Sequence, residues 1–214
     1  MSLRGKFITI EGVEGVGKTT NIAFIKDWLT QNNIPYLTSR EPGGTPIAEE
    51  IRQILLNPRD EAVCNKTELL LMFAARAQHL EQVILPQLNS GSWVLCDRFT
   101  DATYAYQGAG RNMDSQLISQ LESMIQGTLR PDLTLILDIP PEEGLKRANQ
   151  RGSLDRFEQE KIEFFERVRE CYQLIAKRDP KRCVVIDASQ PLSKVQVCVK
   201  EALEIFYNGL QEEN

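Results

Sequence analysis

Short apolar segments alternate with longer segments of helical spacing along the chain. The apolar segments are four to six residues long and comprise Phe7–Glu11, Tyr36–Ser39, Trp93–Asp97, Leu133–Asp138 and Cys183–Asp187. They are mostly apolar throughout instead of alternating between polar and apolar positions. This pattern is typical of strands in a parallel sheet that is covered on both faces. We therefore predict strands at these five places.

The longer segments predict helices. They are Lys18–Gln31, Ile47–Leu56, Thr67–Leu88, Ser115–Ile125, Glu142–Gln150, Gln159–Arg178 and Leu192–Leu210. Strands that alternate with helices in this way favour an α/β fold with right-handed crossover connections. A length of 214 residues without repeats or a linker-like tract suits one domain.

Several predicted strands end in an acidic residue, namely Glu11, Asp97, Asp138 and Asp187. In open parallel sheets, the ligand crevice lies outside the carboxyl ends of the strands. We therefore expect the chemistry of this protein at that edge of the sheet.

A phosphate-binding motif directly follows the first predicted strand. It matches G-x-x-x-x-G-K-[ST] and consists of Gly12, Val13, Glu14, Gly15, Val16, Gly17, Lys18, Thr19 and Thr20. Glycines let the backbone turn several N–H groups toward one point, and the following helix contributes the positive end of its dipole. In such a motif the lysine reaches the β- and γ-phosphates and the hydroxyl binds Mg²⁺. The sequence therefore predicts ATP or GTP binding.

Two other classes of P-loop protein fit less well. A GTP-driven switch protein needs D-x-x-G, but no aspartate of this chain has glycine three positions later, and Asn65-Lys66-Thr67-Glu68 carries Glu where the guanine motif has Asp. A mechanical ATPase usually has an acidic pair after an apolar strand, whereas here the third predicted strand ends in Asp97-Arg98. An acidic residue beside a cation favours Mg²⁺ together with a second phosphate group.

A second anion site is indicated by Arg40, which follows the second predicted strand and precedes Pro42-Gly43-Gly44. That turn could aim Arg40 toward Arg98 and the phosphate-binding loop. Farther along, Phe73 and Arg76 are three residues apart on one predicted helix. They are either a core ring with a surface cation, or a site where the ring stacks on a pyrimidine and the guanidinium donates to a base carbonyl.

Overall charge and cysteine content limit the partners and the cellular compartment that we expect for this protein. The net charge of −5 disfavours a broad basic surface for nucleic acid, although local arginines can still attract a small anion. The five cysteines form no C-x-x-C pair and no zinc-site spacing, so we expect buried, reduced thiols. No apolar stretch approaches the ~20 residues of a membrane span, and no signal peptide is evident. We expect a cytoplasmic protein with neither a membrane nor a nucleic acid as partner.

These residues together resemble thymidylate kinase of the bacterial type. The matching pieces run in family order and are Glu11–Thr20, Arg40–Thr45, Leu71–Gln78, Asp97–Arg111, Arg130–Asp138, Lys146–Glu158 and Ile186–Gln190. The resemblance implies a P-loop NTPase fold with a five-stranded parallel sheet flanked by helices, a lid at approximately residues 147–158, and usually a homodimer. It also implies the reaction of ATP with dTMP to give ADP and dTDP, in dTTP biosynthesis.

On the donor side, the resemblance implies that residues 12–20 bind the ATP phosphates. Lys18, Asp97, Arg98 and Arg151 would be catalytic, and Thr19 and Asp97 would position Mg²⁺. Arg147 and Arg156 would assist Arg151, the lid arginine. Adenine would lie near the lid and the Asp187–Gln190 loop.

On the acceptor side, the resemblance implies that Arg40 and Arg98 bind the phosphate of dTMP. Phe73 would stack on thymine, and Arg76, Thr103 and Gln107 would lie at its polar edge. Tyr106 would crowd the 2′ position of the sugar, and Glu14 would meet the 3′-hydroxyl.

The acceptor phosphate needs no strong base, because the second pKa of a phosphate monoester is near ~6. The single histidine, His79, is therefore expected to be a packing or helix-surface residue. Two alternatives stay open: a related P-loop kinase with another nucleotide or nucleoside acceptor, and a nucleotide-binding regulator without turnover.

Overall fold

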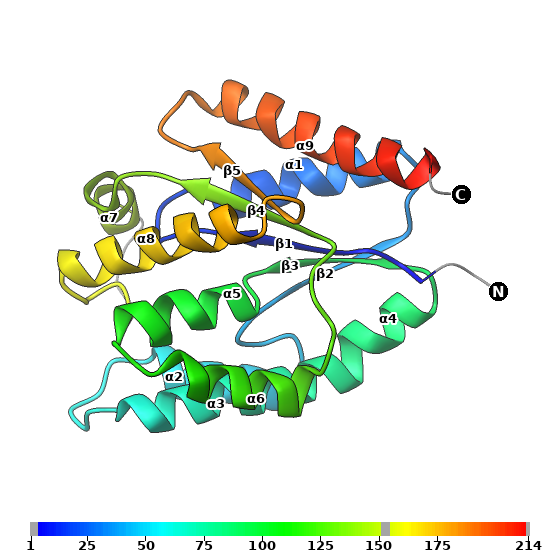
Figure 1. Cartoon of the computed structure of the whole chain (residues 1–214). Helices are drawn as coiled ribbons and strands as arrows, with labels where there is room; N and C mark the ends of the chain where they lie inside the picture. Colours follow the sequence, from blue (N-terminus) through cyan, green and yellow to red (C-terminus); the bar gives the residue numbers. More distant parts are fainter. Residues whose placement is uncertain (1–3, 151–154, 213–214) are drawn as a thin grey trace.

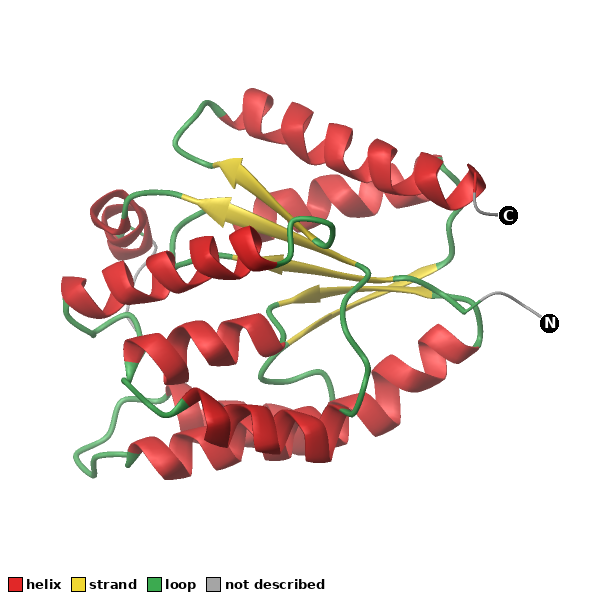
Figure 2. Cartoon of the chain, viewed as in Figure 1, coloured by secondary structure: helices red, strands yellow, loops and turns green. Residues whose placement is uncertain are grey.

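The computed structural model describes residues 4–150 and 155–212 (Figure 1). Within these ranges one sheet contains five parallel strands in the order β2-β3-β1-β4-β5, and their arrows point the same way (Figure 2). The strands are β1 (Phe7–Glu11), β2 (Tyr36–Arg40), β3 (Trp93–Asp97), β4 (Leu133–Asp138) and β5 (Cys183–Asp187). The predicted sheet is confirmed, with β2 one residue longer than expected.

The predicted helices are present, and most of their ends lie within a few residues of the expected positions. They are α1 (Lys18–Gln31), α2 (Pro46–Leu56), α3 (Asn65–His79), α4 (Leu85–Asn89), α6 (Ser115–Gln126), α7 (Pro141–Asn149), α8 (Ile162–Arg178) and α9 (Leu192–Glu212). The segment predicted as one helix over Thr67–Leu88 is divided, because a π-helical stretch, η1 (Leu80–Ile84), separates α3 from α4. Pro86 lacks the N–H that would continue the helical ladder.

A further helical segment was not predicted. It consists of α5 (Thr100–Thr103) and the π-helical η2 (Tyr104–Gly110). Threonine, tyrosine and two glycines make this stretch a poor intrinsic helix, so tertiary packing must hold it. Gly110 illustrates this packing, since a Cβ there would lie 2.5 Å from the Phe164 ring of α8. Wide π-helical turns often occur at functional sites, and η2 carries Tyr106 and Gln107.

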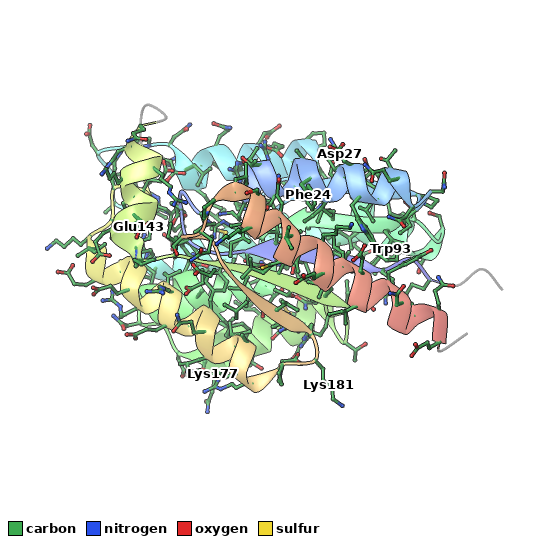
Figure 3. The ribbon with its side chains drawn as sticks, turned by 90° about the horizontal axis from the view of Figure 1, so that it is seen from above. Phe24, Asp27, Trp93, Glu143, Lys177 and Lys181 are labelled. Carbon is green, nitrogen blue, oxygen red and sulfur yellow. The ribbon has the colours of Figure 1, made fainter. Side chains whose placement is uncertain are left out.

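Helices cover both faces of the sheet (Figure 1). Helices α1 and α9 lie on one face, where they contact β1, β3 and β5, while α8, α4 and α5 lie on the other. Trp93 packs edge-on against Phe206 of α9 with ring centroids 5.8 Å apart, and Figure 3 shows Trp93 beside this helix. The interior strand β1 is buried along its whole length, as its apolar sequence predicts.

Strand register brings the charged strand ends together at one edge of the sheet. Asp97 pairs with Ile10 on one side and with Arg40 on the other, and Asp138 pairs with Asp187. The loops that follow these strands therefore meet at the carboxyl edge.

The expectation of buried thiols is wrong for Cys64 and Cys198, which are exposed, although all five cysteines are free. Within residues 4–150 and 155–212, no helix is both long and apolar enough to cross a membrane.

Candidate active site

The phosphate-binding loop joins β1 to α1 and depends on glycines at three points. Gly12, Gly15 and Gly17 have φ values of 133°, 71° and 89°, which other residues rarely adopt. Gly15 also approaches α7 so closely that a Cβ would lie 2.0 Å from the Gly144 carbonyl oxygen. The loop therefore adopts a turn that its glycines permit and larger residues would not.

Lys18 closes this loop from the first turn of α1. Its Nζ donates to the carbonyl oxygens of Gly12 and Val13, both at 3.3 Å. Burial, followed by the nearby Arg98 charge, lowers the pKa of Lys18 to about 8, while Asp97 and Glu14 act in the opposite direction. The arrangement places an ammonium group where the phosphates of a nucleotide would lie.

A cavity of about 550 Å³ extends from this loop to α3 and η2. Its described lining includes six cationic side chains, namely Lys18, Arg40, Arg52, Arg76, Arg98 and Arg147. Thr19, Asp97, Thr103, Tyr106 and Gln107 line the same cavity, so most of the predicted site residues share one space. Clustered cations of this kind concentrate anionic ligands.

Arg98 lies between the two ends of the cavity. Its φ of 68° is unusual for a residue with a side chain, and its backbone N–H donates to the Ile10 carbonyl at 3.0 Å. The guanidinium donates to Glu14 at 2.9 Å and lies 4.6 Å from the centre of the Tyr106 ring. The Tyr106 hydroxyl also donates to Glu14, at 2.7 and 2.8 Å. Glu14 thus holds both residues in fixed positions.

Of the acidic strand ends, Asp97 lines the cavity. Its buried Oδ1 has no hydrogen-bond partner among the described residues. Glu11 instead lies below the site, where it accepts from the Phe99 N–H at 2.7 Å and the Tyr172 hydroxyl at 2.8 Å. Burial raises the pKa of Glu11 to about 8, and the charge of Asp101 contributes in the same direction. Asp97 is therefore the strand-end carboxylate available to a ligand.

The other two strand ends have structural partners. Asp138 accepts a two-point contact from Arg169 at 2.7 and 2.8 Å. Asp187 accepts from Ser189 and Gln190, so it holds the turn after β5 instead of lining the cavity.

Arg40 stands at the rim of the cavity, and its side chain is half exposed. It contacts Glu49 at 2.8 Å, and this hydrogen bond raises the pKa of Arg40. Arg52 of α2 also lines the cavity and donates to the Pro42 carbonyl at 2.9 Å. Sequence reasoning missed Arg52, since an arginine on a helix carries no signal of its direction.

Arg76 is the most deeply buried cation of the lining, with 2% of its side chain exposed. Its Nε donates to Glu41 at 2.7 Å and its Nη2 donates to Thr103 at 2.9 Å. Its Nη1 has no acceptor among the described residues. Gln107 lies at the same end, where its amide donates to Glu68 at 2.9 Å.

Phe73 is not among the described residues that line the cavity, and the expectation that its ring stacks on a base stays a prediction. It is buried in a hydrophobic cluster with Leu69 and Ile118. Met72, one position earlier on α3, lines the cavity. As the spacing of three residues predicts, Phe73 lies beside Arg76, with its ring centre 4.9 Å from the guanidinium.

The three arginines of the expected lid differ in where they lie. Arg151 lies outside the described residues. Arg147 lines the cavity and donates to the Ala188 carbonyl at 3.2 Å, which links α7 to the Asp187–Gln190 loop. Arg156 lies 2.6 Å from the Glu68 carboxylate and donates to the Leu55 carbonyl, and it is not among the described residues that line the cavity. The expectation that Arg156 assists phosphoryl transfer stays a prediction.

The donor set fits a magnesium ion. Among the described residues, no cluster of three or more histidine, cysteine or carboxylate side chains could form a closed metal site. A hydroxyl at Thr19 and the unpartnered Oδ1 of Asp97 line the same cavity. Magnesium is commonly held by one or two such groups together with substrate phosphates and water.

Fold and site together define a P-loop nucleotide-binding protein with a second cationic subsite beside its phosphate-binding loop. The family model described as thymidylate kinase matches residues 10–199. The chain belongs to the thymidylate kinase family.

Individual relatives agree over nearly the whole chain. A thymidylate kinase of Teredinibacter turnerae is 56% identical over 204 residues, which is 95% of this chain and 100% of the relative. One of Hahella chejuensis is 54% identical over 94% of this chain and 96% of its own length. The crystal structure of thymidylate kinase from Ehrlichia chaffeensis superimposes with a TM-score of 0.75 at 34% identity, covering 94% of this chain and 99% of that chain.

Proposed function

We propose that this protein transfers the γ-phosphoryl group of ATP to dTMP and forms ADP and dTDP. The observation that carries this proposal is one cavity with Lys18 and the phosphate-binding loop at one end and the Arg76 guanidinium at the other. Two nucleotides bound end to end would bring their phosphates together near Arg98. Family membership supports this activity.

At the donor end, backbone N–H groups of the loop and the Lys18 ammonium bind the ATP phosphates. Thr19 and Asp97 are the residues that would hold Mg²⁺. When bound there, the ion would supply positive charge that offsets the charge of the phosphates.

At the acceptor end, Arg40 and Arg98 bind the dTMP phosphate, while Arg76 donates to a carbonyl of thymine. Met72 supplies an apolar surface for the base. Tyr106, which Glu14 holds in place, excludes a 2′-hydroxyl.

Because the acceptor oxygen is already ionised at neutral pH, catalysis consists of positioning and of stabilising charge. Arg98 is suited to this task because it is partly buried, oriented by Glu14, and located between the two phosphate positions. Arg151, carried over from the family resemblance, would add a further cation when the lid closes.

The test is coupled ADP release with dTMP, dUMP, dCMP, UMP and thymidine assayed in parallel with Mg²⁺. We expect dTMP to give the highest kcat/KM and thymidine to give none, since thymidine lacks the group that Arg40 and Arg98 bind. Rapid turnover of another acceptor with dTMP inert would replace this proposal by a related kinase. Binding of ATP without turnover of any acceptor would favour the regulator.

We further propose a cytoplasmic homodimer. Large apolar side chains are exposed on α3 and on the two helices that contact it, namely Leu70 on α3, Ile47 and Ile54 on α2, and Met124 on α6. A second copy of the chain would cover this face. Light scattering should give twice the mass of the chain, and Leu70→Glu should shift it toward that of one chain.

A further inference from the structure

His79 is completely buried on α3, close to the acceptor end of the cavity, yet it is not among the described residues that line the cavity. The phosphoryl transfer proposed above gives it no chemical task. Its two ring nitrogens are nevertheless both engaged. Nδ1 lies 3.1 Å from Glu41 Oε1, and Nε2 lies 2.6 Å from Ser39 Oγ.

These contacts place a proton on Nδ1. A carboxylate only accepts hydrogen bonds, so Nδ1 carries a proton and donates to Glu41. The Ser39 hydroxyl, which can both donate and accept, engages Nε2. Both ring nitrogens are therefore satisfied within the protein.

The other oxygen of Glu41 extends the chain of contacts to the site. Glu41 Oε2 accepts from Arg76 Nε at 2.7 Å, so one carboxylate joins the histidine to the arginine. Thr103 fixes Nη2 of Arg76 at 2.9 Å, and the Phe99 ring lies 5.0 Å from the guanidinium. Only Nη1 is left without an acceptor among the described residues.

Backbone packing keeps the loop of Glu41 against the histidine. Gly44, in the same loop, has a φ of 89°, and a Cβ there would lie 2.5 Å from both His79 Cδ2 and Nε2. The loop therefore lies directly on the imidazole. Ser39 and Glu41, two residues apart, both turn toward it.

We propose that His79 and Glu41 are positioning residues that orient Arg76 for reading the base of dTMP. This inference rests on the proposed function. Glu41 balances the buried charge of Arg76 and sets the plane of its guanidinium, while His79 holds Glu41. The free Nη1 then donates to a carbonyl of thymine, which cytosine replaces by an amino group at the corresponding position.

Kinetics of the variant His79→Leu test the inference. Without the histidine, we expect the KM for dTMP to rise at least about 10-fold, in line with the weakening of one hydrogen bond to a charged group. The KM for ATP and the kcat should change less than about twofold. The preference for dTMP over dCMP should also fall, because a mobile guanidinium distinguishes carbonyl from amino groups poorly.

Two milder variants separate positioning from simple support of the fold. His79→Asn places an amide donor near the Nδ1 position and should restore much of the dTMP affinity. Ser39→Ala removes only the outer contact and should have the smallest effect. Thermal melting of each variant shows whether the protein has remained folded.

A double-mutant cycle with Arg76→Ala gives the decisive result. If His79 acts through Arg76, then His79→Leu should raise the KM for dTMP no further when Arg76 is already absent. Additive effects, equal rises of both KM values, or an unchanged dTMP to dCMP ratio would overturn the inference. Failure of the proposed function looks different, because the parent protein itself would then show no turnover of dTMP.

Discussion

The two ends of the cavity are built in different ways. The donor end is one continuous stretch, residues 12–20, which presents backbone groups and a single lysine. The acceptor end is assembled from side chains of α3, α5, η2 and the loop after β2, which are distant in sequence. Backbone sites depend on where glycines allow the chain to turn, whereas side-chain sites depend on which face of a helix each residue occupies.

This difference predicts that a substitution at one end of the cavity weakens binding of the nucleotide at that end and leaves binding at the other end nearly unchanged. Arg98 lies between the two ends and should be the exception.

Replacing Lys18 should damage the donor end most severely. Lys18→Ala removes the cation that would stabilise charge on the transferring group, so we expect kcat to fall about 10³-fold and the KM for ATP to rise. The KM for dTMP should change less than about threefold. Steady-state kinetics with each substrate varied provide the measurement, and Lys26→Ala, an exposed position on the same helix, is the control.

Arg98→Ala should affect both ends, because the guanidinium lies between the two phosphate positions. We expect kcat to fall about 10²-fold to 10³-fold and the KM for dTMP to rise. The same two-substrate kinetics measure this effect. A loss confined to the KM for ATP would mean that Arg98 belongs to the donor end alone.

Met72 and Phe73 provide a matched pair within the acceptor end. Met72→Ala should raise the KM for dTMP several-fold, because it removes apolar surface beside the base. Phe73→Leu should lower the free energy of unfolding by about 1–2 kcal/mol and leave the KM for dTMP nearly unchanged, since that ring lies in the core. Denaturation and kinetics on both variants measure the two effects, and the reverse pattern would restore Phe73 as the base platform.

Glu11 should make the free energy of unfolding depend on pH, and replacing it should change kcat little. Its pKa is about 8 in the folded protein and 4.5 without perturbation, so the folded state keeps a proton that the unfolded state has released. The contribution of Glu11 to stability is complete below pH 4.5 and is lost as the pH rises through 8, at about 1.4 kcal/mol per pH unit between these values.

Glu11→Gln keeps an acceptor for the Phe99 N–H and can donate to Tyr172. Urea denaturation at pH 6 and pH 7.5 should therefore show a smaller loss of stability in the variant than in the parent protein. Equal losses in both would show that Glu11 is ionised in the folded state.

The sheet and the donor loop were predictable because their signals are local. Apolar runs such as Phe7–Glu11 specify buried strands, and the spacing of glycines before Lys18 specifies the loop. The predicted strand ends also indicated the edge of the sheet at which the cavity lies, where Asp97 lines it. Asp138 and Asp187, which have the same sequence signature, proved to be structural because their partners come from other elements.

The acceptor end was predictable only in part. Helical spacing placed Phe73 and Arg76 side by side, but it gave no indication that Met72 lines the cavity. The segment α5–η2 lacked helical propensity and is held by contacts such as Gly110 with Phe164. The roles inferred for Glu41 and His79 have no sequence signature, because they depend on a contact between the loop after β2 and α3.

The most direct test of two separate ends is calorimetric binding of ATP with Mg²⁺, and of dTMP, to Lys18→Ala and Arg76→Ala. We predict that Lys18→Ala loses ATP affinity and retains dTMP affinity, and that Arg76→Ala shows the opposite pattern. If either variant lost affinity for both ATP and dTMP while melting at the same temperature as the parent protein, that result would contradict this account.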